Sequence, residues 1–269
     1  MYNIDISPSE QDIANASKSE LLEYYAAMAS VNPKLDLPSI PPGMEQIHKK
    51  TLDSHGQFAA SMMISHFQGI LQGFFVGLVG AKRVLEIGTL TGSSAIYFAH
   101  ALKRNGVGPG PYSDEKMPVI SLEISEEYAY QARENFATAG VSDYINVIVG
   151  DAHEELVTLD GQQFDLIFID ADKNSYKAYY DIIMDKGLLS KNGLLIIDNT
   201  ALWKVTDFIG KPTDDEATAA IVKIPFLEST HEQVGRVLHD FNEYIRNDPK
   251  TEVIMFPIFT GMSFVRFVK

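Results

Sequence analysis

Two short motifs place carboxylate and amide side chains where apolar runs end. The run FIDADK supplies Asp170, Asp172 and Lys173, and the run IIDN supplies Asp198 and Asn199. If the two runs are neighbouring parallel strands, Asp170 and Asp198 lie close together at one sheet edge and repel each other unless a positive charge lies between them. A hard divalent cation with oxygen ligands meets that need, and Asn199 adds a neutral oxygen.

The ligand types in these motifs indicate which cation fits. Neither motif contains histidine or cysteine, which favours magnesium, with manganese or calcium as alternatives, over softer metals. The competing interpretation is structural, because Asp and Asn often cap helices and bond to turns. Both interpretations stay open at this point, although two such motifs at successive strand ends favour the cation.

A glycine-rich segment, EIGTLTGSS from Glu86 to Ser94, joins an apolar run to a helical pattern. Its glycines allow a sharp turn and a close approach of the backbone to a ligand. The following helix turns its free N–H groups toward an anion such as a pyrophosphate or an amino-acid carboxylate. Glu86 suits the ammonium group of a methionine-like tail better than a pyrophosphate. The structural alternative is a tight strand-to-helix turn without a ligand.

Two further strand ends carry polar residues. Glu123 closes the run VISLE, and an acid at this place accepts the ribose hydroxyls of a nucleoside in NAD enzymes and methyltransferases alike. Its alternative interpretation is a surface carboxylate. The elbow Gly150–His153 after the third run is a candidate for contact with an adenine edge, or Asp151 caps the helix that follows.

These motifs need a scaffold. Short apolar runs alternate with helical patterns, which predicts an α/β fold with a parallel sheet covered on both faces and ligands at the carboxyl ends of its strands. The predicted strands are Val84–Ile87, Val119–Leu122, Ile145–Val149, Leu166–Ile169 and Leu194–Ile197. The predicted helices are Ser93–Lys103, Glu126–Ala139, Tyr176 to about Leu188, and about Gln233–Arg246. The runs Val253–Ile258 and Ser263–Val268, joined by a turn at Thr260-Gly261, predict an antiparallel hairpin at the sheet edge.

The chain is expected to divide into an N-terminal arm, residues 1–43, and one domain, residues 44–269. The arm contains one helical stretch, Ser19–Ala29, and a proline-rich connector, Asn32–Gly43, that is expected to run extended. The domain begins with a helical pattern from Met44 to about Val79.

Composition limits the function classes. The chain has 269 residues, 45% of them hydrophobic, no cysteine and a formal net charge of −14. The lack of cysteine excludes disulfides, thiolate metal ligands and cysteine nucleophiles. Nucleic-acid binding draws its affinity from Lys and Arg side chains that neutralise phosphates, so we expect no nucleic-acid partner. Because no apolar stretch is long enough to span a membrane and the N-terminus does not read as a signal peptide, we expect no membrane association and a cytoplasmic location.

Six segments together resemble one known family. They are VLEIGTLTGSSA, ISLEIS, VGDA, FDLIFIDADKNSYKAYY, GLLIIDNTALW and FPIFTGMSF. The combination is similar to the caffeoyl-CoA O-methyltransferase family, the cation-dependent catechol methyltransferases, from about Thr51 to the C-terminus. The resemblance implies a Rossmann-like seven-stranded sheet with the last strand antiparallel, and an enzyme that depends on S-adenosylmethionine and is usually a homodimer.

The same resemblance implies roles for individual residues. The residues implied to bind S-adenosylmethionine are Thr51, Glu86, Gly88, Thr89, Ser94, Glu123, Ala152 and Asp172. Asp170, Asp198 and Asn199 are implied to be the metal ligands. Lys173 matches the lysine proposed as general base, so Lys173 and Asp170 are the expected catalytic residues.

The implied roles agree with the chemistry of a phenol, whose ordinary pKa of about 10 makes it a poor nucleophile at neutral pH. A divalent cation lowers the pKa of an oxygen acid, and the two neighbouring hydroxyls of a catechol can chelate one cation. The sulfonium donor carries a good leaving group, so most of the remaining work is positioning. Lys173 would accept the proton if neutral or stabilise the phenolate if charged.

The chain departs from the family pattern at three places where a substrate is expected. Ala201 intervenes before Leu202-Trp203, Phe259-Thr260-Gly261 takes the place of a Gly-Asp-Gly ending, and the loop Lys204–His231 is longer than usual. These departures concern the acceptor rather than the cofactor or the metal. Trp203 is either a substrate contact or a core residue.

The acceptor is expected to be a small free phenol. A coenzyme A thioester would need basic residues for its phosphates, and few are present in the expected substrate loops beyond Lys204 and Lys211.

Two other function classes compete with a methyltransferase. An NAD-dependent oxidoreductase on a similar sheet would be expected to carry the motif G-x-G-x-x-G in its first loop. Each possible alignment of that motif with the loop of this chain matches at most a single glycine. Such an enzyme would also leave Asp170, Asp198 and Asn199 without a role. A non-catalytic nucleoside-binding protein is the second alternative, and the complete set of candidate ligands argues against it.

An aromatic-rich run precedes the first predicted strand and includes Phe74, Phe75 and Val76. It is either part of an interface between two subunits or ordinary core packing. Because members of the family that this chain resembles are usually homodimers, we also expect a homodimer here.

Overall fold

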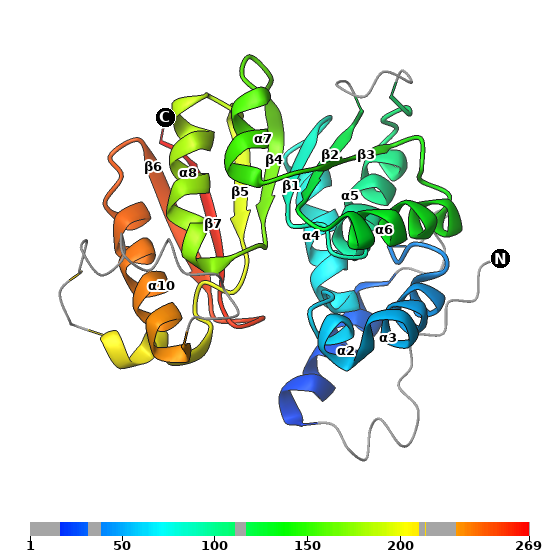
Figure 1. Ribbon diagram of the computed structural model, residues 1–269, viewed down its shortest axis with the longest axis horizontal. Coiled ribbons are helices and arrows are strands. Elements are labelled where there is room, and N and C mark those ends of the chain that lie inside the picture. Colours follow the sequence, from blue (N-terminus) through cyan, green and yellow to red (C-terminus); the bar gives the residue numbers. More distant parts are fainter. Residues whose placement is uncertain (1–16, 32–38, 111–116, 210–212, 214–229, 269) are drawn as a thin grey trace. The chain divides into compact units, whose positions relative to one another are not determined.

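The computed structural model describes residues 17–31, 39–110, 117–209, 213 and 230–268 (Figure 1). Much of the predicted connector Asn32–Gly43 and of the loop Lys204–His231 lies outside these residues. The described residues belong to two compact units. Unit 1 comprises Met1–Lys82, Thr89–Ile120 and Ser125–Val147, and unit 2 comprises Arg83–Gly88, Ser121–Ile124 and Ile148–Lys269. The division into an arm of residues 1–43 and a domain of residues 44–269 stays a prediction.

Seven strands form one sheet in the order β3-β2-β1-β4-β5-β7-β6, which confirms the predicted fold class. The strands are β1 (Val84–Ile87), β2 (Val119–Glu123), β3 (Ile145–Val149), β4 (Phe164–Ile169), β5 (Leu189–Ile197), β6 (Thr251–Phe256) and β7 (Met262–Phe267). β1 pairs in parallel with β4, and β4 with β5. All residues of β1 are buried, as expected for a parallel strand whose two faces are covered.

The C-terminal hairpin confirms the predicted antiparallel edge. β7 runs antiparallel to β5 and to β6, so the last strand of the chain lies inside the sheet and β6 forms its edge. The turn between them contains three successive residues with positive φ: Phe259 at 51°, Thr260 at 59° and Gly261 at 88°. Only Gly261 adopts such a φ without strain, so surrounding contacts must hold the other two.

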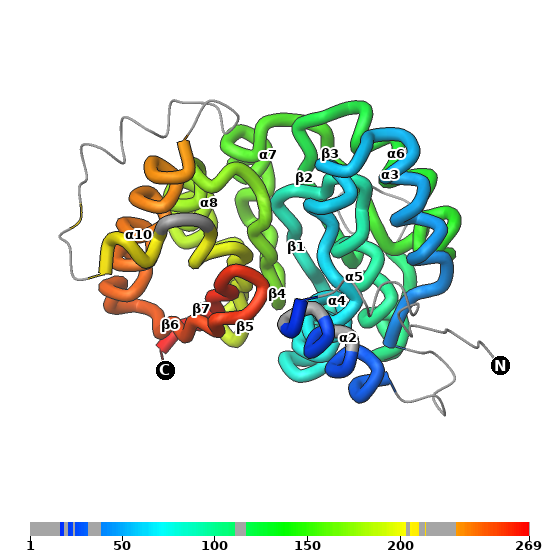
Figure 2. Tube along the Cα trace, turned by 90° about the horizontal axis from the view of Figure 1, so that it is seen from below, coloured from blue at the N-terminus to red at the C-terminus, as the bar shows by residue number. Residues whose placement is uncertain are grey.

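Unit 1 contains most of the N-terminal helices. They are α2 (Lys18–Ser30), α3 (Met44–Ser61), α4 (His66–Leu78), α5 (Ser93–Arg104) and α6 (Glu126–Ala139). Figure 2 shows α2 beside α4 and α3 beside α6. The predicted helical pattern from Met44 to about Val79 is present as two helices, because the chain leaves the helix after Ser61 and enters the next one at His66. Ser65 starts α4 by accepting a hydrogen bond from the Gln68 N–H at 3.2 Å, and a capped N-terminus defines a new helix.

Small residues bring α4 close to α5. A Cβ placed on Gly69 would lie 2.5 Å from the Tyr97 ring, and one placed on Gly73 would lie 3.3 Å from the Ala101 Cβ. The Tyr97 hydroxyl bonds to His66 Nδ1 at 2.7 Å, which fixes the ring against the glycine. Burial lowers the pKa of His66 and raises the pKa of Tyr97, so this bond joins two neutral groups at pH 7.

Unit 2 contains the remaining helices. They are α7 (Ala152–Thr158), the 3-10 helices η2 (Lys173–Ser175) and η3 (Trp203–Phe208), α8 (Tyr176–Asp185) and α10 (His231–Arg246). Figures 1 and 2 show α8 and α10 on one face of β5, β6 and β7. α10 begins with a capping box in which Thr230 and Gln233 satisfy each other's backbone N–H groups.

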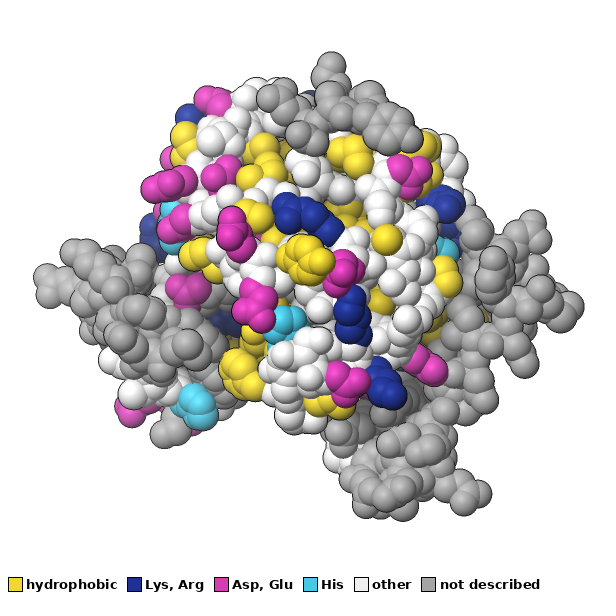
Figure 3. Space-filling view, turned by 45° about the vertical axis from the view of Figure 1, so that its right-hand side comes forward, with side chains coloured by type: hydrophobic (Ala, Val, Ile, Leu, Met, Phe, Trp, Pro, Cys, Tyr) yellow, Lys and Arg dark blue, Asp and Glu magenta, His cyan; other side chains and the backbone are white. Residues whose placement is uncertain are grey.

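The aromatic run on α4 is divided between core and surface. Val76 is fully buried, whereas Phe74 is 59% and Leu78 65% exposed. Core packing therefore accounts for Val76 and does not account for Phe74. On the face shown in Figure 3, hydrophobic side chains lie in separate groups among acidic, basic and uncharged ones. Among the described residues, no helix combines the length and hydrophobicity needed to cross a bilayer.

The close approach of α4 to α5 predicts the effect of one methyl group. Gly69→Ala gains about 1 kcal/mol of helix propensity, but its Cβ overlaps the Tyr97 ring, and overpacking costs about 1–3 kcal/mol. We expect a lower free energy of unfolding in urea. Gly73→Ala gains the same propensity with a contact that a small shift relieves, so it should be neutral or stabilising. Equal stabilisation by both substitutions would contradict this account of the contact.

Candidate active site

The carboxyl ends of the parallel strands are held together in unit 2 by backbone hydrogen bonds. A residue just beyond one strand donates its N–H to the end of the neighbouring strand. The four bonds are Gly150 to Glu123 at 2.9 Å, Gly88 to Leu122 at 3.0 Å, Asp170 to Ile87 at 2.9 Å, and Asp198 to Ile169 at 3.0 Å. The strand ends that carry candidate residues therefore lie at one edge of the sheet.

Gly88 lies directly against the loop after β4. Its φ is 98°, and an added Cβ would lie 2.0 Å from the backbone oxygen of Asp170. Both facts require glycine, because other residues disfavour this φ and no side chain fits in this space. The loop that follows β1 and the loop that carries Asp170 thus touch through their backbones.

Glu86 is fully buried in β1 and accepts a hydrogen bond from the Ser121 hydroxyl of β2. A buried carboxylate is stable only with donors or positive charge around it. Ser121 supplies such a donor, and the sequence reasoning missed it. Its small polar side chain within the buried run VISLE is the signal that could have identified it.

The ends of β2 and β3 place three candidates. Glu123 is 8% exposed, and its backbone oxygen accepts the Gly150 bond. Ala152 is the first residue of α7, which Asp151 caps by accepting from the His153 N–H at 2.9 Å and from His153 Nδ1 at 2.8 Å. Burial raises the pKa of Asp151, but the hydrogen bonds from His153 hold it below its ordinary value. The structure therefore gives Asp151 the capping role.

Asp172 caps η2. Its Oδ1 accepts from the Asn174 N–H at 3.2 Å and from Asn174 Nδ2 at 3.0 Å, and its Oδ2 accepts from the Ser175 hydroxyl at 3.0 Å. These bonds are the turn-stabilising alternative considered from the sequence.

Lys173 forms an ion pair with Asp170. Its Nζ lies 2.8 Å from Asp170 Oδ1, and the lysine side chain is 7% exposed. Burial lowers the pKa of Lys173, whereas the Asp170 carboxylate and the Tyr176 hydroxyl raise it, and the net pKa lies above the ordinary value. The ion pair with Asp170 therefore favours the charged form of Lys173.

The loop after β5 carries the other candidate ligands. Asp198 is 3% exposed, and its Oδ1 accepts from the Asn199 N–H at 2.9 Å. The Tyr176 hydroxyl donates to the Asp198 backbone oxygen at 3.0 Å. Asn199 has a φ of 55°, a left-handed value that Asn adopts more readily than most other residues with a side chain.

The C-terminal hairpin orients the Asn199 amide. Asn199 Nδ2 donates to the Thr260 hydroxyl at 2.8 Å and to the Phe259 backbone oxygen at 3.3 Å. This assignment turns Oδ1, the atom that can bind a cation, away from those two partners. The Thr200 hydroxyl bonds to Ser263 at 2.9 Å, and Asn242 donates to the Thr200 backbone oxygen at 2.8 Å.

Asp170, Asp198 and Asn199 match a hard cation in donor type. The described residues contain no group of three or more His, Cys, Asp or Glu side chains placed to hold a metal ion. The candidate set differs from such a group because it combines two carboxylates with an amide. Trp203 begins η3, and its side chain lies outside the described part of the structure.

The other expected cofactor residues lie in unit 1. Thr89 is 2% and Ser94 7% exposed, so both are nearly covered. Thr51 is fully buried and bonds to the Ile47 backbone oxygen at 3.0 Å and to the Thr91 hydroxyl at 2.9 Å. Ser93, which the sequence reasoning passed over, has a buried hydroxyl without a hydrogen-bond partner among the described residues at the first position of α5.

Comparison with known proteins gives consistent results. The sequence model of an O-methyltransferase family matches residues 39–268. The catechol O-methyltransferase of Mycobacterium tuberculosis is 36% identical over 157 residues, 58% of this chain and 64% of that protein. The caffeoyl-CoA O-methyltransferase of Populus kitakamiensis is 27% identical over 253 residues, 93% of this chain and 94% of that protein. This chain is also similar to the crystal structure of the SAH-bound methyltransferase PaMTH1 of Podospora anserina. The two share 26% sequence identity with a TM-score of 0.70, and the match covers 98% of this chain and 98% of that chain.

The contact between Gly88 and Asp170 predicts a large effect of Gly88→Ala. The substitution adds a left-handed penalty of about 1–2 kcal/mol and an overlap with a backbone oxygen that no rotamer relieves. We expect the free energy of unfolding to fall by about 3 kcal/mol or more. Gly80→Ala is the matched control, because Gly80 has a φ of 63° and nothing within 4 Å of its added Cβ. Equal losses for the two variants in urea unfolding would show that the overlap is unimportant.

Proposed function

Since this chain belongs to the O-methyltransferase family, we propose that it transfers the methyl group of S-adenosylmethionine to one of two neighbouring hydroxyls of a small catechol-like molecule, with a divalent cation at Asp170, Asp198 and Asn199. The membership confirms the expected enzyme class and the resemblance to caffeoyl-CoA O-methyltransferases. It also excludes the NAD-dependent oxidoreductase and the non-catalytic nucleoside-binding protein.

Residues at the ends of β1 and β2 support the donor site. Glu86 provides a buried negative charge for an ammonium group, and Gly88 provides close backbone access. Glu123 provides a nearly buried carboxylate that can accept two ribose hydroxyls. Ser93 adds a buried hydroxyl that has no partner among the described residues, as expected for a group that a ligand completes. Thr89, Ser94, Ala152 and Asp172 are the further proposed contacts.

The donor set after β4 and β5 supports a hard cation. Asp170 and Asp198 follow paired parallel strands, because Ile169 and Ile197 are register partners. When bound, the cation would supply the positive charge that lowers the pKa of a hydroxyl and favours a chelating pair of hydroxyls. Magnesium fits the all-oxygen set, with manganese or calcium as substitutes.

Lys173 has the position and charge to stabilise a developing phenolate. Its ammonium group is buried, bonded to Asp170, and lies 5.1 Å from the centre of the Tyr176 ring. A protonated lysine lowers the energy of a nearby anion without accepting its proton. Asp170 contributes to both parts of the site, since it holds Lys173 and is a proposed cation ligand.

The proposed acceptor is inferred from the relatives of this chain and from its net charge. Relatives named for catechol and for caffeoyl-CoA support a vicinal diol, since both molecules carry one. The net charge of −14 disfavours the polyanionic coenzyme A group, so a small free phenol fits better. Trp203, at the start of η3 beyond Asn199, is the proposed aromatic contact for this acceptor.

The principal test is methyl transfer to a catechol with S-adenosylmethionine, followed as S-adenosylhomocysteine formed. Asp198→Ala should lower kcat at least about 100-fold, because the loss of one buried ligand removes several kcal/mol of positioning and charge stabilisation. Calorimetry should show loss of Mn²⁺ binding and unchanged S-adenosylhomocysteine affinity. Chelation should reproduce the loss, and added Mg²⁺ should reverse it.

Asp185→Ala is the control for removal of a carboxylate, because Asp185 is exposed at the far end of α8. It should leave turnover and Mn²⁺ binding unchanged. Full turnover after thorough chelation would refute the cation, and failure of the wild-type protein to bind S-adenosylhomocysteine would refute the donor.

We also propose a homodimer that covers the exposed part of α4. Phe74 and Leu78 are separated by one helical turn and are both more than half exposed, so they form an apolar stripe on one side of the helix. Such pairs gain free energy when a partner removes them from water.

Phe74→Glu tests this dimer. A charge on the stripe should shift the mass measured by light scattering at micromolar concentration from dimer to monomer, because burying an unpaired carboxylate is costly. Tyr130→Glu, at an exposed aromatic residue on α6, should leave the mass unchanged. A monomeric wild-type protein would rule out the proposal.

A further inference from the structure

The loop Gly88–Gly92, which joins β1 to α5, contains a strained residue. Leu90 has a φ of 49°, and a left-handed conformation costs an L residue about 1–2 kcal/mol. Such residues persist only where neighbouring contacts determine the backbone, and they gather at binding sites. The loop therefore needs an external support that holds it in this conformation.

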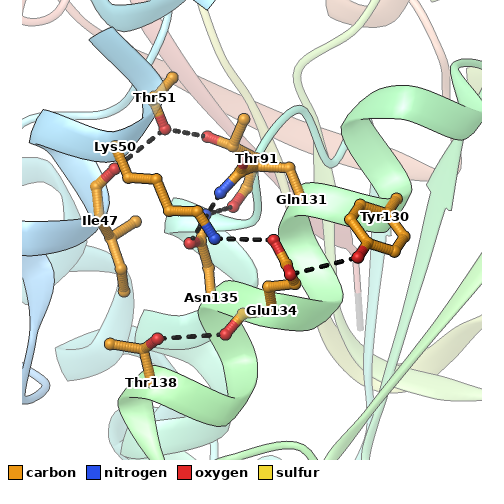
Figure 4. Close-up of polar contacts among 9 residues, drawn as sticks. All are labelled: Ile47, Lys50, Thr51, Thr91, Tyr130, Gln131, Glu134, Asn135 and Thr138. Atoms are coloured by element: carbon orange, nitrogen blue, oxygen red, sulfur yellow. Dashed lines mark hydrogen bonds and ion pairs between the residues drawn. The ribbon is translucent and has the colours of Figure 1, made fainter. Parts of the chain in front are cut away.

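Side chains from two helices provide that support at Thr91. Figure 4 shows Thr51 of α3 and Asn135 of α6 directed toward Thr91. The Thr51 hydroxyl lies 2.9 Å from the Thr91 hydroxyl, and Asn135 Nδ2 donates to the Thr91 backbone oxygen at 2.8 Å. Thr91 is thus held through its side chain and its backbone at once.

The direction of each bond in this group is fixed. Thr51 donates its hydroxyl proton to the Ile47 backbone oxygen at 3.0 Å, so Thr91 must donate to Thr51. Gln131 donates to Asn135 Oδ1 at 3.2 Å, which orients the Asn135 amide group with its nitrogen toward Thr91.

Because these groups are buried, their hydrogen bonds contribute strongly to the stability of the loop conformation. Thr51, Thr91 and Asn135 have no exposed surface, and a buried polar group that loses its partner keeps the full cost of its desolvation. The conformation that satisfies all three side chains is the one that keeps the loop in place.

A second set of contacts in Figure 4 differs in exposure. Lys50 pairs with Glu134 at 2.7 Å, Tyr130 donates to Glu134, and the Thr138 hydroxyl bonds to the Glu134 backbone oxygen at 3.1 Å. These groups lie on the same two helices but are exposed to solvent, where such pairs contribute little. They are matched controls for the buried set.

From these contacts we propose that Thr51 and Asn135 are positioning residues that act through Thr91 to hold the Gly88–Gly92 loop in its cofactor-binding conformation. The inference rests on the proposed function, in which this loop binds the methionine part of S-adenosylmethionine. The inference gives Thr51 a role other than direct contact with S-adenosylmethionine, since the Thr51 side chain is fully buried.

A loop held in place before the ligand arrives loses no further conformational entropy on binding. Release of Thr91 would let Leu90 relax from its left-handed conformation. The affinity for the cofactor would then fall by the cost of reforming the loop, while the chemistry of the bound complex would be unchanged.

The decisive comparison is Thr51→Val against Thr51→Ser. Valine keeps the shape and removes the hydroxyl, whereas serine keeps the hydroxyl. Calorimetry should show S-adenosylhomocysteine binding about tenfold weaker for Thr51→Val, the equivalent of one buried hydrogen bond. Thr51→Ser should bind within about twofold of the wild-type protein. KM for S-adenosylmethionine should rise with Thr51→Val, while kcat at saturating donor and KM for the acceptor stay unchanged.

Asn135→Ala should weaken binding similarly, and the double variant should lose less than the product of the two single losses, since both act through Thr91. Lys50→Met and Thr138→Val should change nothing. A general loss of stability would reduce the active fraction and hence kcat, so it would not imitate the expected rise in KM.

Wild-type affinity in folded Thr51→Val and Asn135→Ala overturns the inference and leaves the proposed function intact. Absence of S-adenosylhomocysteine binding by the wild-type protein would instead refute the donor site. Hydrogen exchange of the cofactor-free wild-type protein decides the case even if both variants fail to fold. Protected amides in residues 88–92 support the proposal, and free exchange that only the ligand suppresses overturns it.

Discussion

The peptide unit of Asp170 is the constraint on which the candidate site depends. Its N–H bonds to the end of β1, its backbone oxygen lies against Gly88, and its carboxylate holds Lys173. One residue thus joins the glycine-rich loop, where the cofactor is proposed to bind, to the charges proposed to act on the acceptor. In the proposed reaction, backbone contacts would therefore hold the two parts of the site at a set separation, which matters because methyl transfer depends on the geometry of donor and acceptor.

The pairing of buried charged groups favours one arrangement of the side chains in the candidate site. Glu86, Lys173 and Asp198 are all less than a tenth exposed, and each buried charge must be paired or hydrogen-bonded. Ser121 meets Glu86, Asp170 meets Lys173, and the Asn199 N–H meets Asp198. A rearrangement of the loops after β4 or β5 that broke these contacts would leave Lys173 or Asp198 without its partner, so the observed arrangement is preferred.

Local signals in the sequence predict much of this structure, and long-range contacts account for the rest. The helix Glu126–Ala139 was predicted with its observed bounds, because Ser125 caps one end and Gly140, with a φ of 67°, ends the other. β5 begins five residues earlier than predicted, at Leu189 rather than Leu194, since Leu189 pairs with Phe164 of β4 and the polar segment Ser190–Asn192 lies in the irregularity between that pair and Leu194. Asp170 and Asp198 were predictable from strand ends. Tyr176 and Asn135 were not, because their partners lie 22 and 44 residues away and their own positions read as ordinary helix.

The edge position of β6 affects how the protein behaves at high concentration. In the part of the chain that the structure describes, β7 is the one strand that pairs with β6, so the outer side of β6 faces no described strand, and Ile254 on β6 is 59% exposed. An open edge of this kind invites strands of other molecules to add to the sheet. Glu252, paired with Arg266, puts charge on that strand, and Pro257, which has no N–H, follows its last residue. The sheet therefore ends in a strand that is only six residues long and carries two of the features by which β proteins avoid fibrous aggregation.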